Sequence, residues 1–155
     1  DAVARLFDMR GGSVVSSFVG HESDINAVDF MSTGMGFASG SDDDHCKIFD
    51  SRARAEIASF CPEGDDGGDS IVGGAVSSVA FSHSGRLLFA GYEDAKALAW
   101  EILTESRKWH KLTHNPEGGA AAKRAQNDRI SCLGVNNTGE ALCTGSWDME
   151  LRVWA

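Results

Sequence analysis

The sequence predicts an all-β chain that is built from several copies of one small four-stranded sheet. Apolar residues occur in short runs bounded by turn residues, and no segment keeps the 3.6-residue period of an amphipathic helix. A pattern of glycine, aspartate and aromatic residues also recurs three times along the chain. The 18 glycines among 155 residues fit the many tight turns that such a chain needs.

The repeat is anchored on three glycines, Gly34, Gly85 and Gly139. A second glycine, an aspartate and an aromatic residue follow each anchor at six, nine and fifteen residues, and apolar residues precede it by four, six and nine. In chain order the followers are Gly40, Asp43, Phe49, Gly91, Asp94, Trp100, Gly145, Asp148 and Trp154. Agreement at so many positions indicates three copies of one structural unit. Asp1 stands six residues before Phe7, which is the same step as from Asp43 to Phe49, so a fourth, partial copy opens the chain.

Each copy is expected to contain four short strands. In the first copy they are predicted at 25–30, 37–40, 46–49 and 55–60. The range 13–18 is the predicted fourth strand of the opening partial copy, and 107–112 is that of the second copy. Gly34 supplies the positive φ of the first turn. The run Ser41-Asp42-Asp43-Asp44 closes the second turn through side-chain hydrogen bonds to the backbone.

Four strands per copy, with an aspartate and then an aromatic residue near its end, resemble a blade of a WD40 β-propeller. Such a propeller is a ring of about 4–8 blades. Residues 1–155 are therefore expected to form a partial propeller of about three complete four-stranded blades plus a partial blade. Residues 1–10 should end a blade, and 13–50, 55–101 and 107–155 should be successive repeats. The insertions 61–75 and 113–127 are expected to be mobile surface loops. Half a ring exposes strand edges and blade faces, so we expect the chain to need the rest of the propeller or a partner chain.

Composition excludes several classes of function. The 14 basic and 23 acidic residues give a net charge of −9, which disfavours nucleic acid as a partner. No apolar run is long enough to span a membrane, and no secretory signal is evident. The four cysteines, Cys46, Cys61, Cys132 and Cys143, lack zinc-site spacing and are expected to be free thiols.

Four strings of sequence carry a more specific resemblance. Residues 20–27 read GHESDINA, 84–94 read SGRLLFAGYED, 129–135 read RISCLGV and 144–148 read TGSWD. These strings resemble the beta subunit of heterotrimeric G proteins. The resemblance implies a seven-bladed ring of which this chain is the C-terminal part.

That resemblance also implies a function. The family is a non-enzymatic signalling scaffold that binds the GDP-bound alpha subunit and the gamma subunit and presents a face to effectors. It would be cytoplasmic, peripheral at the inner face of the plasma membrane, and bound to the membrane only indirectly through gamma. The alternative is another intracellular WD40 adaptor, for instance a ribosome-associated or kinase-anchoring type.

The resemblance assigns the alpha-subunit and effector interface to Asp24, Asn26, Asp42 and Trp147. A tryptophan in a turn has no core to fill, and an exposed tryptophan among acidic residues is typical of interface hot spots. The alternatives are structural. Asp24 and Asn26 have side chains that satisfy backbone groups at strand starts, and Trp147 has a neighbouring loop on which it can pack.

The family also uses a buried hydrogen-bond network to join loop and blade. By resemblance its members here are His21, Ser39, Asp43, Asp94, Trp100, Thr144, Asp148 and Trp154. Phe49 has no N–H, so the first network should end early, and Ala90 lacks the hydroxyl that Ser39 and Thr144 provide.

Two other chemistries are weighed against these assignments. His21, Ser39 and Asp43 have the residue types of a hydrolase triad, but the structural network is the preferred interpretation. Asp42 to Asp44, or Asp65, Asp66 and Asp69, lack the alternating oxygens and closing glutamate of a calcium loop. We therefore expect no catalytic residue, no cofactor and no metal ion.

Overall fold

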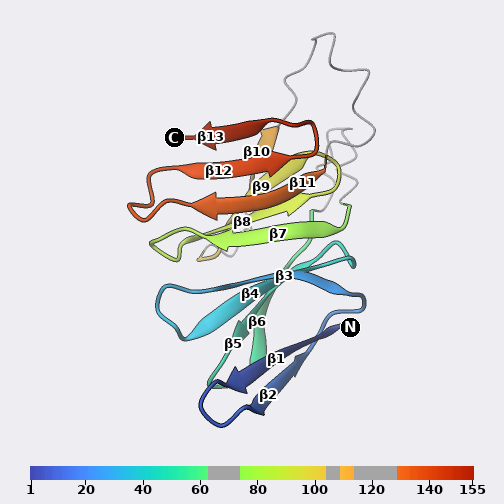
Figure 1. Ribbon diagram of the computed structural model, residues 1–155, viewed down its shortest axis with the longest axis vertical. Helices are drawn as coiled ribbons and strands as arrows, with labels where there is room; N and C mark the ends of the chain where they lie inside the picture. The colour runs from blue at the N-terminus through green and yellow to red at the C-terminus, as the bar shows by residue number, and fades with distance from the viewer. Residues whose placement is uncertain (63–73, 104–108, 114–128) are drawn as a thin grey trace.

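The described residues of the computed structural model, 1–62, 74–103, 109–113 and 129–155, form β-strands joined by turns, with no helix among them (Figure 1). The all-β prediction is confirmed. The strands are β1 Val3–Asp8, β2 Ser13–Val19, β3 Ile25–Phe30, β4 Gly36–Ser41, β5 Cys46–Asp50, β6 Ala55–Phe60, β7 Val76–Phe81, β8 Leu87–Tyr92, β9 Lys96–Glu101, β10 Trp109–Thr113, β11 Ile130–Val135, β12 Leu142–Ser146 and β13 Leu151–Trp154.

The strands form four antiparallel sheets that follow one another along the chain. The orders are β1-β2, β3-β4-β5-β6, β7-β8-β9-β10 and β11-β12-β13. The first strands of the last three sheets, β3, β7 and β11, lie side by side in Figure 1. Sheets that pack face to face, with their first strands next to one another, are propeller blades. The predicted partial propeller is therefore confirmed.

The sheets differ in one respect from the expected blade count. Among the described residues, two of the four sheets have four strands, the last sheet has three and the first has two. The strand expected at 13–18 is β2, and it pairs with β1. The strand expected at 107–112 is described from Trp109 onwards as β10. The predicted loops 61–75 and 113–127 fall almost wholly outside the described residues, and the predicted repeat boundaries stay predictions.

The anchoring glycines occupy the turns that follow the inner strands. Gly34, Gly85 and Gly139 have φ values of 69°, 70° and 77°, where other residues are strained. This requirement for positive φ explains why glycine recurs at this place in each copy.

The second glycine of the repeat is required because the next sheet packs closely on its backbone. A Cβ atom on Gly40 would overlap the side chain of Val76 in the next sheet, and one on Gly91 would lie 2.7 Å from Cγ2 of Ile130. The first residues of β7 and β11 thus fit against a bare backbone in the preceding sheet. The six-residue spacing between the two glycines is therefore a signature of sheet-on-sheet packing.

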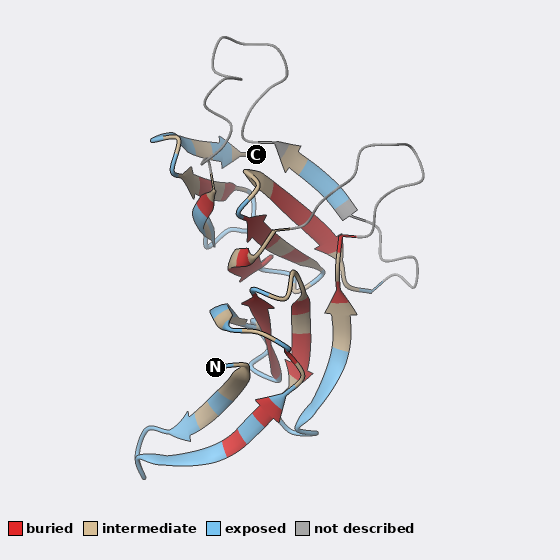
Figure 2. Ribbon diagram, turned by 90° about the vertical axis from the view of Figure 1, so that its right-hand side faces the viewer, coloured by how far each residue is buried: buried red, intermediate tan, exposed pale blue. Residues whose placement is uncertain are grey.

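Two clusters of buried side chains hold the sheets together (Figure 2). The larger lies between the second and third sheets and includes Trp100, Tyr92 and Cys46. The smaller joins the first two sheets through Phe18 and Phe37, whose ring centroids are 4.9 Å apart. All four cysteines are free thiols. Burial raises the pKa of the Cys46 thiol to about 12, so this thiol stays protonated and unreactive at neutral pH.

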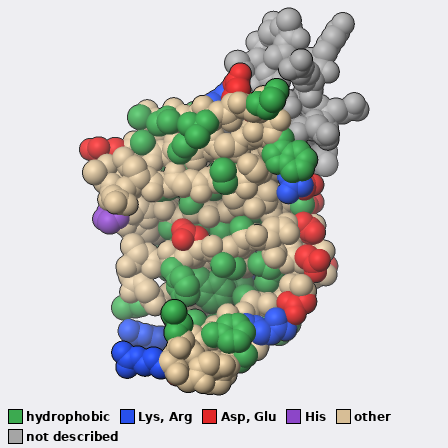
Figure 3. All heavy atoms as spheres, viewed as in Figure 1, with side chains coloured by type: hydrophobic (Ala, Val, Ile, Leu, Met, Phe, Trp, Pro, Cys, Tyr) green, Lys and Arg blue, Asp and Glu red, His purple; other side chains and the backbone are tan. Residues whose placement is uncertain are grey.

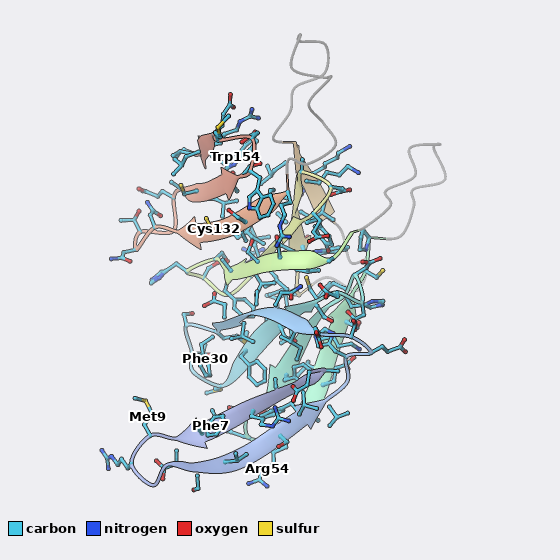
Figure 4. All side chains as sticks on the ribbon, turned by 45° about the vertical axis from the view of Figure 1, so that its right-hand side comes forward. Phe7, Met9, Phe30, Arg54, Cys132 and Trp154 are labelled. Carbon is cyan, nitrogen blue, oxygen red and sulfur yellow. The ribbon has the colours of Figure 1, made fainter. Side chains whose placement is uncertain are left out.

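A hollow of about 420 Å³ lies beside the two-stranded first sheet. Figure 3 shows hydrophobic side chains gathered there, and Figure 4 shows Phe7 and Phe30 on β1 and β3 at its two sides. Each of these two phenylalanines is 57% exposed. Completion of this sheet by further propeller strands or by a partner stays a prediction, and the exposed rings are the surface that such strands would cover.

The packing of the sheets predicts the effect of adding one methyl group. We expect Gly40→Ala to lower the free energy of unfolding by about 1–3 kcal/mol, because the methyl group pushes Val76 out of place. Urea denaturation of the full-length protein that contains this chain measures the change. Gly74→Ala is the matched control, since a Cβ there lies 3.5 Å from the nearest atom, Cβ of Glu93, and should not lower the free energy of unfolding. Equal effects of the two variants would contradict the packing role of Gly40.

Candidate docking face

The starts of β3, β7 and β11 share one end of the molecule with the turns that precede β5, β9 and β13, because neighbouring strands are antiparallel. One backbone hydrogen bond recurs at this end. The amide N–H of Asp42 donates to the carbonyl of Asp24 over 2.9 Å, and that of Trp147 donates to the carbonyl of Arg129 over 3.0 Å. In the middle sheet the N–H of Glu93 donates to the carbonyl of Ala75 over 3.1 Å.

We call the surface formed by Asp24, Asn26, Asp42, Glu93, Arg129 and Trp147 the turn face. It brings together the four residues that the sequence assigned to an interface, although they are up to 123 positions apart in the chain (147 − 24). Glu93 and Arg129 were missed. They stand at the repeat positions of Asp42 and Asp24, and this equivalence is the sequence signal that identifies them.

The turn face is mainly acidic. The side chains of Asp24 and Glu93 are 73% and 44% exposed, and Asp42 is also exposed. Figure 3 shows acidic side chains along the right-hand edge of the molecule, where β3, β7 and β11 begin in Figure 1. Such a surface attracts partners with exposed lysine or arginine side chains.

The titration of Asp44, in the turn beside this face, reflects the same concentration of charge. Burial raises the pKa of Asp44, and the carboxylates of Asp43, Asp42 and Asp94 raise it further against the opposing effect of His45. Carboxylates from two successive sheets therefore act on one side chain.

Trp147 is 59% exposed, so it is not a core residue. The Arg129 guanidinium lies 4.7 Å from its ring centroid, and Nη1 of Arg129 lies 2.9 Å from Oε1 of Glu93 in the neighbouring sheet. The tryptophan thus stacks on a cation that is itself paired with an acid. One ring face rests on the protein while much of the side chain stays available to a partner.

Asn26 has a different situation from the other members of the turn face. Its Nδ2 donates to Oδ1 of Asp42 over 2.5 Å and to the carbonyl of Val76 over 3.1 Å. Both contacts lie within this chain, one in the same sheet and one in the next.

A buried hydrogen-bond chain lies behind the turn face. Nδ1 of His21 is 2.8 Å from Oδ2 of Asp43, and Nε2 of His21 is 2.7 Å from Oγ of Ser39. Because an ionised carboxylate only accepts, Nδ1 carries the donated proton. The Phe49 ring lies at the end of this chain, 6.4 Å between centroids from the His21 imidazole, and has no N–H to extend it.

The same three residues do not form a usable hydrolase triad. Ser39 and the His21 side chain are both fully buried, at 0% exposure. A nucleophile needs room for the carbonyl that it attacks, and this serine has none. The arrangement is suited to holding a loop against a sheet.

The other two copies have different contacts. In the β11-β13 sheet Nε1 of Trp154 donates to Oγ1 of Thr144 over 3.0 Å, and Oδ1 of Asp148 accepts from the Glu150 amide over 2.8 Å. In the β7-β10 sheet Asp94 forms an ion pair with Lys96 over 2.6 Å. Trp100 is buried there and packs on Phe60 with centroids 5.5 Å apart.

No cluster of three or more metal-ligating side chains occurs among the described residues. Asp42 is held by Asn26 and Asp43 by His21, so these two carboxylates do not converge on one ion. The other calcium alternative, Asp65, Asp66 and Asp69, lies outside the described residues. No helix in the part of the chain that the structure describes is long and apolar enough to cross a bilayer.

Comparison with known proteins places the repeats in a described family. The model of the WD domain, G-beta repeat, matches residues 12–50, 70–101 and 122–155. The chain is 41% identical over 158 residues to a guanine nucleotide-binding protein subunit beta of Oryza sativa subsp. indica and 41% identical over 157 residues to that of Arabidopsis thaliana. The corresponding protein of Solanum tuberosum is 42% identical over 157 residues. Each comparison covers 100% of this chain and 38% of the relative, so the chain spans about two-fifths of their length.

The buried network predicts how stability depends on pH. Burial alone would raise the pKa of Asp43, but hydrogen bonds from the Glu22 amide, the His21 ring and the His45 amide together hold it below its usual value. A lowered pKa in the folded state stabilises the protein at pH values above the unfolded-state pKa of about 3.9, and this contribution is lost as the pH falls through the folded-state value. We expect Asp43→Asn to cost about 2 kcal/mol at pH 7 and progressively less below about pH 4.

Urea denaturation of both proteins between pH 3 and 7 measures this gap. Glu22→Gln, an exposed neighbour, serves as the control and should change stability by less than about 0.5 kcal/mol. A gap for Asp43→Asn that stays constant down to pH 3 would show that the ionised carboxylate contributes nothing.

Proposed function

Because the chain belongs to the WD40 family of repeat proteins, we propose that it is part of a G-protein beta subunit and serves as a non-enzymatic signalling scaffold. Its partner on the turn face is the GDP-bound alpha subunit, and the same face serves effectors after the alpha subunit leaves. The observation that carries the proposal is the exposed Trp147 on the same face as the exposed carboxylates Asp24 and Asp42.

The chemistry of the turn face supports a protein partner. An exposed tryptophan supplies a large, rigid contact surface at a low cost in conformational entropy. The surrounding carboxylates steer a partner with basic side chains and repel the phosphates of nucleic acids. The buried His21–Ser39–Asp43 chain leaves no accessible nucleophile behind the face, which fits a scaffold.

The remaining partners follow from the similarity to G-protein beta subunits. The protein pairs with a gamma subunit through parts of the full-length chain outside this sequence. It is cytoplasmic and lies at the inner face of the plasma membrane through the lipid on gamma, since a lipidated partner is enough for peripheral attachment. The rest of the propeller covers the apolar hollow beside β1.

Binding to a GDP-loaded alpha subunit tests the proposal. With the full-length protein paired to its gamma subunit, we expect Trp147→Ala to weaken binding at least about tenfold, because a central aromatic contact is lost. Asp24→Ala should mainly slow association, and added salt should reduce its effect.

Glu140→Ala is the matched acidic control. Glu140 lies in the turn between β11 and β12, at the opposite end of β12 from Trp147, so this change should leave binding unaltered. If the unaltered protein does not bind any GDP-loaded alpha subunit of its organism, the proposal is wrong, and another intracellular WD40 adaptor role takes its place.

A further inference from the structure

We propose that Asn26 is a positioning residue, which holds the Asp42 carboxylate on the turn face and at the same time fastens the second sheet to the third. This proposal deepens the proposed function and rests on it for its binding arm. It differs from the role that the sequence resemblance gives Asn26, which is direct contact with the partner.

The side-chain amide of Asn26 has two N–H groups, and both are used inside the chain. One lies 2.5 Å from Oδ1 of Asp42, in the turn between β4 and β5. The other donates over 3.1 Å to the carbonyl of Val76, the first residue of β7. The amide therefore has no further proton to donate to a partner, and only its Oδ1 stays able to accept a hydrogen bond.

The contact with Val76 is repeated at the equivalent position of the next copy. Ser77 follows the first residue of β7, as Asn26 follows Ile25, and its hydroxyl donates to the carbonyl of Ile130, the first residue of β11. The hydroxyl also contacts the carbonyl of Gly91 at 3.0 Å. Position 26 or 77 therefore links one inner strand to the next, whichever residue type occupies it.

The contact with Asp42 is the part that a serine does not reproduce. Serine has one donor on a short side chain, whereas asparagine reaches both the neighbouring strand and the turn. Asp42 is exposed and acidic, so without Asn26 its carboxylate would be free to rotate. Holding it in one orientation lowers the entropy lost when a basic partner binds.

The two contacts can be separated by substitution. The variants are made in the full-length protein with its gamma subunit. Asn26→Ala removes both contacts, and Asn26→Ser keeps only the hydrogen-bond donor to the next sheet. Ser77→Ala removes only the equivalent hydrogen bond from β7 to β11. We expect Asn26→Ala and Ser77→Ala each to raise the unfolding equilibrium constant about fivefold, and Asn26→Ser to stay near the unaltered protein. Urea denaturation measures this arm.

Binding to the GDP-loaded alpha subunit is the second arm. Asn26→Ala and Asn26→Ser should both weaken it about fivefold, while Ser77→Ala leaves it unchanged. Asp42→Ala should weaken binding as well, and adding Asn26→Ala to Asp42→Ala should weaken it no further, because Asn26 acts through Asp42.

Two outcomes would overturn the proposal. Full rescue of binding by Asn26→Ser would make Asn26 a packing residue only, and additive losses in the Asn26→Ala/Asp42→Ala double variant would make it a direct contact. If the unaltered protein binds no alpha subunit, the proposed function fails, and unfolding measurements then decide the positioning role. They use a double-mutant cycle of the unaltered protein, Asn26→Ala, Asp42→Ala and the double variant. Zero coupling between Asn26 and Asp42 in that cycle would then overturn it.

Discussion

The structure depends on the fit of one inner strand against the bare backbone of the preceding sheet. Val76 occupies the space that a side chain on Gly40 would need, and Ile130 does the same at Gly91. A four-stranded sheet cannot bury both of its faces alone, so these contacts are what turn separate meanders into one body. This close packing of strand on glycine places the inner strands next to one another, aligns the turns and forms the core clusters between the sheets.

The same approach assembles the turn face. Since the inner strands of successive sheets lie next to one another, equivalent residues of the three copies share one end of the molecule, each held by the same backbone hydrogen bond from turn to strand start. Carboxylates of the first and second copies and the tryptophan of the third thereby form one surface. Its members differ in role. Asp24 is open to solvent, Trp147 rests on Arg129, and Asn26 is bonded to its own chain.

The hydrogen-bond chains behind the turn face show that a blade forms with different polar contacts. His21, Ser39 and Asp43 form a buried chain that ends at Phe49, while the β11-β13 sheet has the Trp154–Thr144 bond and the β7-β10 sheet has an Asp94–Lys96 ion pair. Each polar side chain named here has a partner, as burial demands. The sheets keep the same topology throughout, so apolar packing defines the blade and the polar chain adds to it.

The sequence by itself determined the all-β class, the four-stranded unit, the strand positions to within about two residues and the turns at Gly34, Gly85 and Gly139, because alternation and turn chemistry are local properties. It also indicated Trp147 as exposed, since a tryptophan within a tight turn has no core to enter. The tertiary structure alone decided that Arg129 stacks on Trp147 and pairs with Glu93, and that Asn26 reaches Val76 across 50 residues of chain. Those contacts join different sheets, and their distances are set by how the sheets pack, which no local pattern records.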